Sequence, residues 1–148
     1  MAVAKLWKLT LNGSDLKNNT MAEIKFTGNK SLKSINREWC AKFPYLYLAF
    51  FDADGKHVNA ETWGERTHAS VRGKKDAAEL STTATMHVGT FEQRYEEAFG
   101  CKVEIYHERG GRYYQSLKEN NHLTLSEYNQ QCKEKGAGEF MKVRADLF

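Results

Sequence analysis

Residues 90–111 read Thr90-Phe-Glu-Gln-Arg-Tyr-Glu-Glu-Ala-Phe-Gly-Cys-Lys-Val-Glu-Ile-Tyr-His-Glu-Arg-Gly-Gly111 and begin with the signals of a helix. Thr90 and Gln93 have the spacing of a capping box, in which both side chains bond to free N–H groups at a helix start. Apolar residues then recur every four positions, as in the buried stripe of a helix: Phe91, Tyr95 and Phe99. Gly100 is expected to end this helix.

A strand and a turn are predicted after the helix. Val103 and Ile105 alternate with charged residues, so one face of the strand is expected in the core and the other in water. The segment 108–111 predicts a hairpin turn because its two glycines tolerate positive φ. This order of elements indicates an α+β fold.

The same signals occur 56 residues earlier in the chain. Residues 22–55 align with residues 78–111 without a gap, although only five of the 34 positions are identical. Ser34 takes the capping position, and Pro44 is expected to end the first helix. The matching apolar stripe consists of Ile35, Trp39 and Phe43.

The repeat predicts two related units. We expect them to span residues 1–77 and 78–148, either as separate units or as one compact domain. Their helices are expected near residues 34–43 and 90–99.

The segment after the second hairpin, Thr124-Leu-Ser-Glu-Tyr-Asn129, resembles the short segment before the final strand of the ubiquitin-like β-grasp family. It follows Thr90 by 34 residues, a separation similar to that of the family. The likeness covers roughly residues 78–145, and residues 67–71 carry a weaker copy in the first unit. It implies that each unit is a small mixed sheet packed on one short helix, with a last strand around residues 139–144.

The resemblance does not extend to the end of the chain. The last residues, Arg144-Ala-Asp-Leu-Phe148, contain no Gly-Gly tail, so the conjugation chemistry of ubiquitin is not implied. The whole chain also looks like a tandem-repeat protein of an uncharacterised bacterial family, and this second likeness implies no activity.

Composition excludes several classes of protein. The 148-residue, 17.0 kDa chain is 41% hydrophobic and 28% charged, which is too apolar for disorder and sufficient for one domain or two small units. It lacks a signal-peptide pattern and any apolar run long enough for a membrane span. Its three cysteines lack the spacing of a zinc site or a disulfide framework. We therefore expect a cytoplasmic protein without membrane contact.

Sequence spacing predicts neither a metal nor a cofactor. Asp52 and Asp54 begin like a calcium loop, but Trp63 occupies the position of the closing acid. The five histidines form no ligand pair, and no phosphate-binding glycine loop occurs. Cys101 could pair with His107 or His57 as nucleophile and base, although a packed cysteine is the simpler interpretation. We predict a protein that is not an enzyme, while a site assembled only in three dimensions stays open.

Positive charge is concentrated in the first half. Residues 1–73 contain 11 Lys and Arg against 7 Asp and Glu, and residues 74–148 contain 11 against 12, giving +4 and −1. Four cations fall near one strand end and the first turn of the first helix: Lys25, Lys30, Lys33 and Arg37. An anionic partner would relieve their repulsion with the helix dipole. Nucleic-acid binding by this half is therefore the alternative hypothesis.

The segment 45–51 supports the leading hypothesis. It reads Tyr45-Leu-Tyr-Leu-Ala-Phe-Phe51 and is apolar on both faces, so its own helix cannot cover it. We expect the second face to be covered by the other unit, by a second copy or by a partner protein. The expected partner contacts are Tyr45, Leu46, Tyr47, Leu48 and Phe50. The sequence thus favours a non-catalytic protein–protein interaction module of the adaptor, immunity or inhibitor type.

Overall fold

The computed structural model describes residues 23–74 and 80–148, and its two antiparallel sheets combine strands from both halves of the chain. In the first sheet, β1 (Ile24–Phe26) pairs with β3 (Leu80–Thr82). In the second, β2 (Tyr47–Phe50) pairs with β4 (Val103–Arg109), and β4 pairs with β5 (Arg112–Gln115). The sheets pack against helices, which confirms the α+β class.

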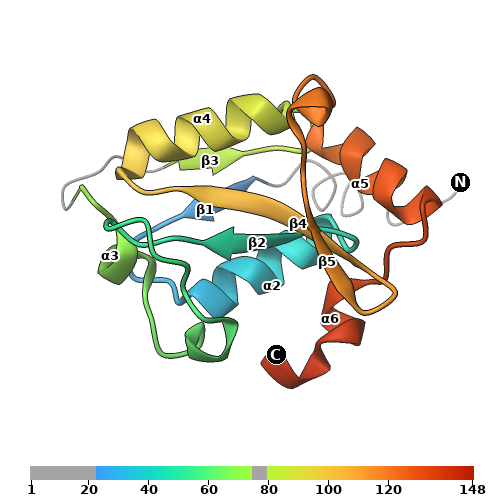
Figure 1. The fold of residues 1–148 in the computed structure, drawn as a ribbon. Helices are drawn as coiled ribbons and strands as arrows, with labels where there is room; N and C mark the ends of the chain where they lie inside the picture. Colours follow the sequence, from blue (N-terminus) through green and yellow to red (C-terminus); the bar gives the residue numbers. More distant parts are fainter. Residues whose placement is uncertain (1–22, 75–79) are drawn as a thin grey trace, which may run out of the picture.

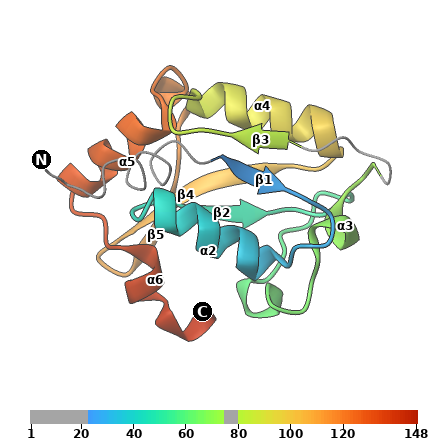
Figure 2. The ribbon, with the colours of Figure 1, turned by 180° about the vertical axis from the view of Figure 1, so that it is seen from behind.

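Helices α2 (Leu32–Lys42) and α4 (Val88–Phe99) flank the sheets. Figures 1 and 2 show the β1–β3 pair and the three-stranded sheet on opposite sides of the molecule, with α4 above and α2 below. Both predicted helices are therefore confirmed. No helix among the described residues is long and apolar enough to cross a membrane.

The predicted helix caps are wrong. Ser31, not Ser34, caps α2, because its side chain accepts from the Ser34 N–H. Helix α4 begins after His87 without a side-chain cap, so Thr90 lies inside its first turn and no capping box forms there. Gly100 does end α4, in the left-handed conformation with φ 69°.

A capping box is found instead at the start of α5 (Leu125–Glu134). The Thr124 hydroxyl accepts from the Glu127 N–H, and the Glu127 carboxylate accepts from the Thr124 N–H. The segment that resembles the β-grasp family thus begins a helix of ten residues.

The prediction of a last strand around residues 139–144 is wrong. This region forms α6 (Phe140–Val143), followed by the 3-10 helix η3 (Ala145–Leu147). The helical turn places the Phe140 ring on the Tyr47 ring, stacked with 3.9 Å between centroids. Burial of two aromatic faces favours this turn over an extended segment.

Each predicted unit was expected to have its own sheet, and the strand pairing shows that this is wrong. Strand β1 pairs with β3 and β2 pairs with β4, which are the elements 56 residues apart. Lys25 lies directly opposite Ser81, its equivalent in the repeat. Strands β1 and β2 of the first half therefore form their ladders with strands of the second half, while β4 and β5 pair within the second half.

The two helix stripes meet in one hydrophobic core. Phe26 of β1 lies against Phe91 and Tyr95 of α4, with centroid distances of 5.7 and 5.6 Å. Trp39 of α2 contacts the same Phe91 at 5.1 Å. Such tilted and edge-to-face ring contacts stabilise the core beyond the burial of area.

Candidate functional site

The two outer edges of the three-stranded sheet differ in their protection. At the β2 edge, the Asn36 Nδ2 donates to the Leu48 carbonyl and its Oδ1 accepts from the Leu48 N–H, both at 2.9 Å. The Val58 N–H donates to the Phe50 carbonyl farther along, also at 2.9 Å. The amide of Asn36 supplies the donor and acceptor that a neighbouring strand would supply. This edge is closed to a partner.

The β5 edge is open. Among the described residues no strand pairs with the outer side of β5. The Ser116 N–H donates to the Ile105 carbonyl of β4 at 2.9 Å. Because successive residues of an antiparallel strand bond to opposite sides, the main-chain groups of Tyr113 and Gln115 point away from β4. Beside this edge, Tyr113 is 43% exposed and Leu117 is 57% exposed.

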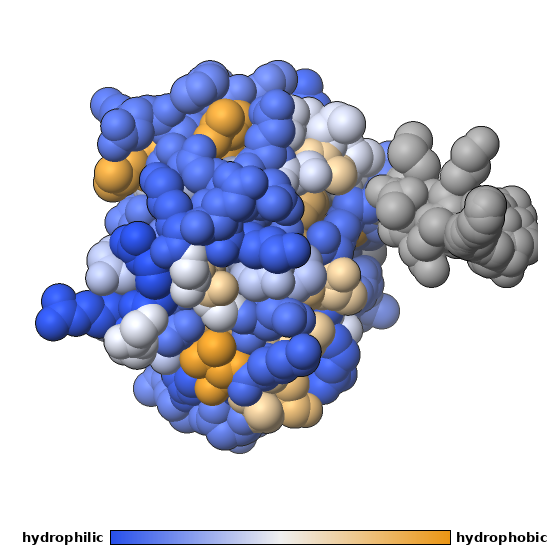
Figure 3. Space-filling view, turned by 90° about the vertical axis from the view of Figure 1, so that its right-hand side faces the viewer, coloured by the Kyte–Doolittle hydropathy of each residue, from blue (hydrophilic) through white to orange (hydrophobic). Residues whose placement is uncertain are grey.

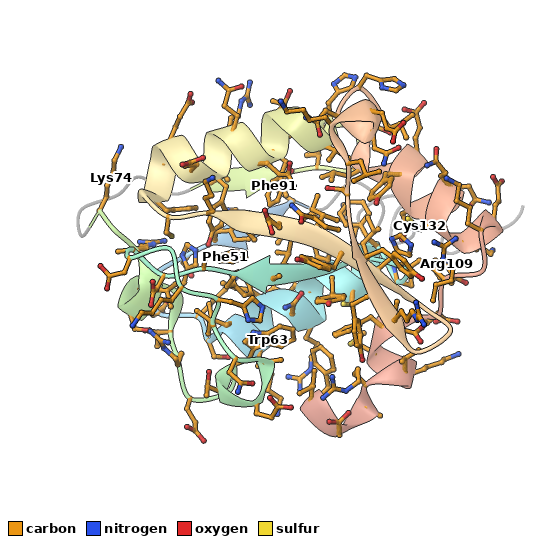
Figure 4. All side chains as sticks on the ribbon, viewed as in Figure 1. Phe51, Trp63, Lys74, Phe91, Arg109 and Cys132 are labelled. Carbon is orange, nitrogen blue, oxygen red and sulfur yellow. The ribbon has the colours of Figure 1, made fainter. Side chains whose placement is uncertain are left out.

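A pocket of about 350 Å³ adjoins the open edge. Residues of β4, β5, the 3-10 helix η2 (Lys118–Asn120) and α5 line it. Arg109 and Lys135 contribute two cations, and no lining residue is an Asp or Glu. Figure 4 shows Arg109 and Cys132, which both line the pocket, at the same end of the molecule.

His107 forms the buried wall of this pocket. It is only 7% exposed, and neither ring nitrogen has a hydrogen-bond partner among the described residues. Its ring stacks on Tyr114, its cross-strand partner, at a centroid distance of 5.4 Å. A buried polar group without a partner destabilises a protein and is rare. The Nε1 atoms of Trp39 and Trp63 are unpartnered as well, but His107 alone among the three residues lines this pocket, where a ligand could supply the missing bond.

The electrostatic environment of His107 is positive. Burial, together with Arg109 and Lys135, lowers the pKa of His107, while Glu108 opposes this with a smaller effect. The imidazole is therefore neutral near pH 7. The Arg109 guanidinium lies over the Tyr114 ring at 4.5 Å, and no carboxylate among the described residues pairs with it.

The residues predicted to contact a partner are buried by, or in contact with, other parts of the same chain. Leu46, Leu48 and Phe50 are 0% exposed and belong to the core, so they cannot contact a partner. Tyr47 is covered by Phe140 of α6, and the Tyr45 N–H donates to Asn129 of α5 at 2.9 Å. The second strand face is therefore covered as expected, and the cover comes from the other predicted unit, one of the three covers considered. The prediction of partner contacts is therefore wrong for Leu46, Leu48 and Phe50, whereas Tyr45 and Tyr47 are only partly buried.

The four predicted anion-binding cations do not form one free patch. The Lys30 ammonium pairs with Glu38 at 3.0 Å and also donates to the Lys25 carbonyl. Arg37 donates to the Phe148 carbonyl at 3.1 Å. Lys33 lines a depression that also contains three acids: Glu61, Glu65 and Asp146. Lys30 is thus paired with an acid, Arg37 is held by a main-chain carbonyl, and Lys33 lies near acids.

The thiols lack the features of nucleophiles. Cys40, Cys101 and Cys132 are all free and buried. Burial raises the pKa of each thiol, for Cys40 to about 12, so the reactive thiolate is disfavoured. Tyr95 rather than a histidine is the side-chain hydrogen-bond partner of Cys101. Among the described residues no group of three or more His, Cys, Asp or Glu could hold a metal ion.

The chain matches no protein-family model, no curated protein and no solved structure. The ubiquitin-like resemblance of residues 78–145 therefore stays a prediction.

Proposed function

We propose that the protein is a non-catalytic interaction module that binds an extended segment of a partner protein along β5. The difference between the two sheet edges supports this proposal. Asn36 closes the β2 edge, whereas the main-chain groups of Tyr113 and Gln115 face outward without a strand beside them. Exposed sheet edges bind peptides by adding a strand, with main-chain hydrogen bonds providing affinity.

The surroundings of β5 suit such a segment. Strand β5 has four residues, which correspond to a length of about 14 Å at about 3.4 Å per residue. Alternate side chains of an added strand would contact Tyr113 and Leu117 or enter the adjoining pocket. Figure 3 shows that the side of the molecule carrying α5 and α6 is mostly hydrophilic, with small separated hydrophobic spots. Recognition through main-chain groups requires no large apolar face.

The proposal includes the cytoplasm as location and excludes catalysis. Three free thiols fit a reducing compartment. The raised pKa values of those thiols fit a structural rather than a nucleophilic role. Nucleic-acid binding by the first half has weaker support, because Lys30 and Arg37 already have partners within the chain.

A matched pair of substitutions tests the proposal. Gln115→Pro removes the outward N–H without breaking the bonds between β4 and β5, whereas Gln115→Ala keeps that N–H and removes only the side chain. The probes are peptides selected on the wild-type protein from a displayed library of random extended sequences.

We expect Gln115→Pro to weaken the binding of the selected peptides about tenfold or more, which corresponds to about 1.4 kcal/mol. The affinity of Gln115→Ala for these peptides should stay near that of the wild type. Circular dichroism of both variants checks that the fold is retained. Equal binding to the wild-type and Gln115→Pro proteins, or a selection that yields no binding peptide, would overturn strand addition.

A further inference from the structure

The pocket beside β5 has three properties that together specify a ligand class. It contains two cations, Arg109 and Lys135, and no acid. It contains a buried histidine, His107, whose ring nitrogens have no partner among the described residues. Its volume of about 350 Å³ lies at the lower end of the range for small-ligand sites and is larger than a single oxyanion needs.

We infer that this pocket binds a phosphate monoester, with Arg109, Lys135 and His107 as its ligands. A phosphate monoester carries about −1.5 to −2 charges near pH 7 and therefore matches two cations, whereas a carboxylate would leave one charge unbalanced. Arg109 can offer two parallel N–H donors to such a group. The Tyr114 and Tyr128 rings form walls for the organic part of the ester.

The inferred source of the phosphate is a phosphorylated side chain of the segment on β5, and this part rests on the proposed function. A segment paired with Tyr113 and Gln115 directs alternate side chains to the sheet face that carries the pocket. The anion site itself does not depend on strand addition. A free phosphate ester would use the same three side chains.

Ligand binding is coupled to protonation of His107. In the free protein, burial and the two cations hold the pKa of His107 below its usual value. A bound dianion favours the imidazolium form and raises that pKa. The affinity for the anion therefore increases as pH falls. The increase is up to about tenfold per pH unit between the pKa of His107 in the bound protein and its pKa in the free protein. The groups that face or act on His107 are Glu108 and Arg109 of β4, Tyr114 of β5, Tyr128 and Cys132 of α5, and Lys135 directly after α5.

Phenyl phosphate is the probe for the anion site, measured by calorimetry and by the NMR signals of the His107 ring. We expect Arg109→Gln and Lys135→Gln each to weaken binding about tenfold or more. Arg94→Gln on α4 and Lys133→Gln on α5 remove the same charges outside the pocket, and we expect them to stay within about twofold. Sulfate serves as the probe for the pH dependence of binding, because it does not titrate in the pH range in which His107 is expected to become protonated.

Absence of binding at millimolar phenyl phosphate would overturn the anion site. Equal weakening by the pocket variants and their controls would also overturn it, because it would show nonspecific attraction. A sulfate affinity that does not rise with falling pH would remove His107 from the site.

A second arm separates the anion site from its source. Peptides with a central phosphotyrosine are compared with their unphosphorylated forms on the wild-type and Gln115→Pro proteins. We expect phosphorylation to strengthen peptide binding. We expect Gln115→Pro to weaken the phosphopeptide more than phenyl phosphate, because Gln115 also lines the pocket. If phenyl phosphate binds in the pocket while phosphorylation has no effect, the partner segment is not the source. If Gln115→Pro leaves the phosphopeptide unaffected, strand addition fails and the anion site stands.

Discussion

The substitution Asn36→Leu tests how the β2 edge is closed. The side-chain amide of Asn36 forms two hydrogen bonds of 2.9 Å with the main chain of Leu48, and Asn36 is 0% exposed. Leucine has a similar size but neither donor nor acceptor. The variant therefore leaves the N–H and C=O of Leu48 buried without partners.

The expected loss of unfolding free energy follows from the unpaired N–H and C=O groups of Leu48. A buried main-chain group without a partner destabilises a protein by about 1–3 kcal/mol, so two such groups predict a loss of about 2–6 kcal/mol. The free energy of unfolding of a small domain is about 5–15 kcal/mol, so the effect is large. The matched control is Asn129→Leu on α5, which removes a single bond to the half-buried Tyr45 N–H. Because water can replace that bond, we expect a loss of only about 0.5–1.5 kcal/mol.

Urea unfolding followed by the fluorescence of the buried Trp39 and Trp63 measures both variants. The comparison requires that the slope of the unfolding free energy against urea concentration is the same in both variants and in the wild type. The reasoning fails if Asn36→Leu lowers the free energy of unfolding by no more than Asn129→Leu does.

Three further predictions concern the stability of the fold. His68 accepts a hydrogen bond from Arg72 Nε at 2.9 Å, and burial lowers the pKa of His68 to about 3. The stabilisation by neutral His68 is complete above pH 6.5 and is lost as pH falls, by about 2 kcal/mol at pH 5. The free energies of unfolding from urea titrations at pH 7 and pH 5 should therefore differ less in His68→Gln than in the wild type. Gly100→Ala should destabilise by about 1–2 kcal/mol, because φ is 69° and a Cβ would lie 3.1 Å from the Lys74 side chain; a thermal midpoint equal to wild type would contradict this. Phe140→Ala uncovers Tyr47 and should lower the free energy of unfolding by about 3–5 kcal/mol, and unchanged urea unfolding would show that α6 does not cover the strand.

Local signals in the sequence sufficed for the helices and the strand between them. The stripes Ile35-Trp39-Phe43 and Phe91-Tyr95-Phe99 are fully or almost fully buried, as predicted. The caps were misplaced because several Ser, Thr and His residues near each start can begin a helix within one turn. The pairing of β1 with β3 was not predicted because no local pattern indicates which distant strand supplies the hydrogen bonds.

The candidate site was missed for a similar reason. Alternation along Val103, Ile105, His107 and Arg109 places a histidine and an arginine on the inward face of a strand, and this signal was available in the sequence. The signal is informative only together with the position of α5, which brings Tyr128, and Lys135 at its end, to the same pocket. The partner surface predicted at residues 45–50 failed because its cover, Phe140, lies about ninety positions away in a segment predicted as a strand.

Amide hydrogen exchange at β5 tests the central claim most directly. In the free protein we predict rapid exchange for Tyr113 and Gln115, whose N–H groups face outward, and slower exchange for Tyr114, whose N–H faces β4. A selected peptide should slow the exchange of Tyr113 and Gln115 specifically. If both amides are already protected in the free protein, or if their exchange is unchanged when a peptide binds, β5 does not form the binding edge.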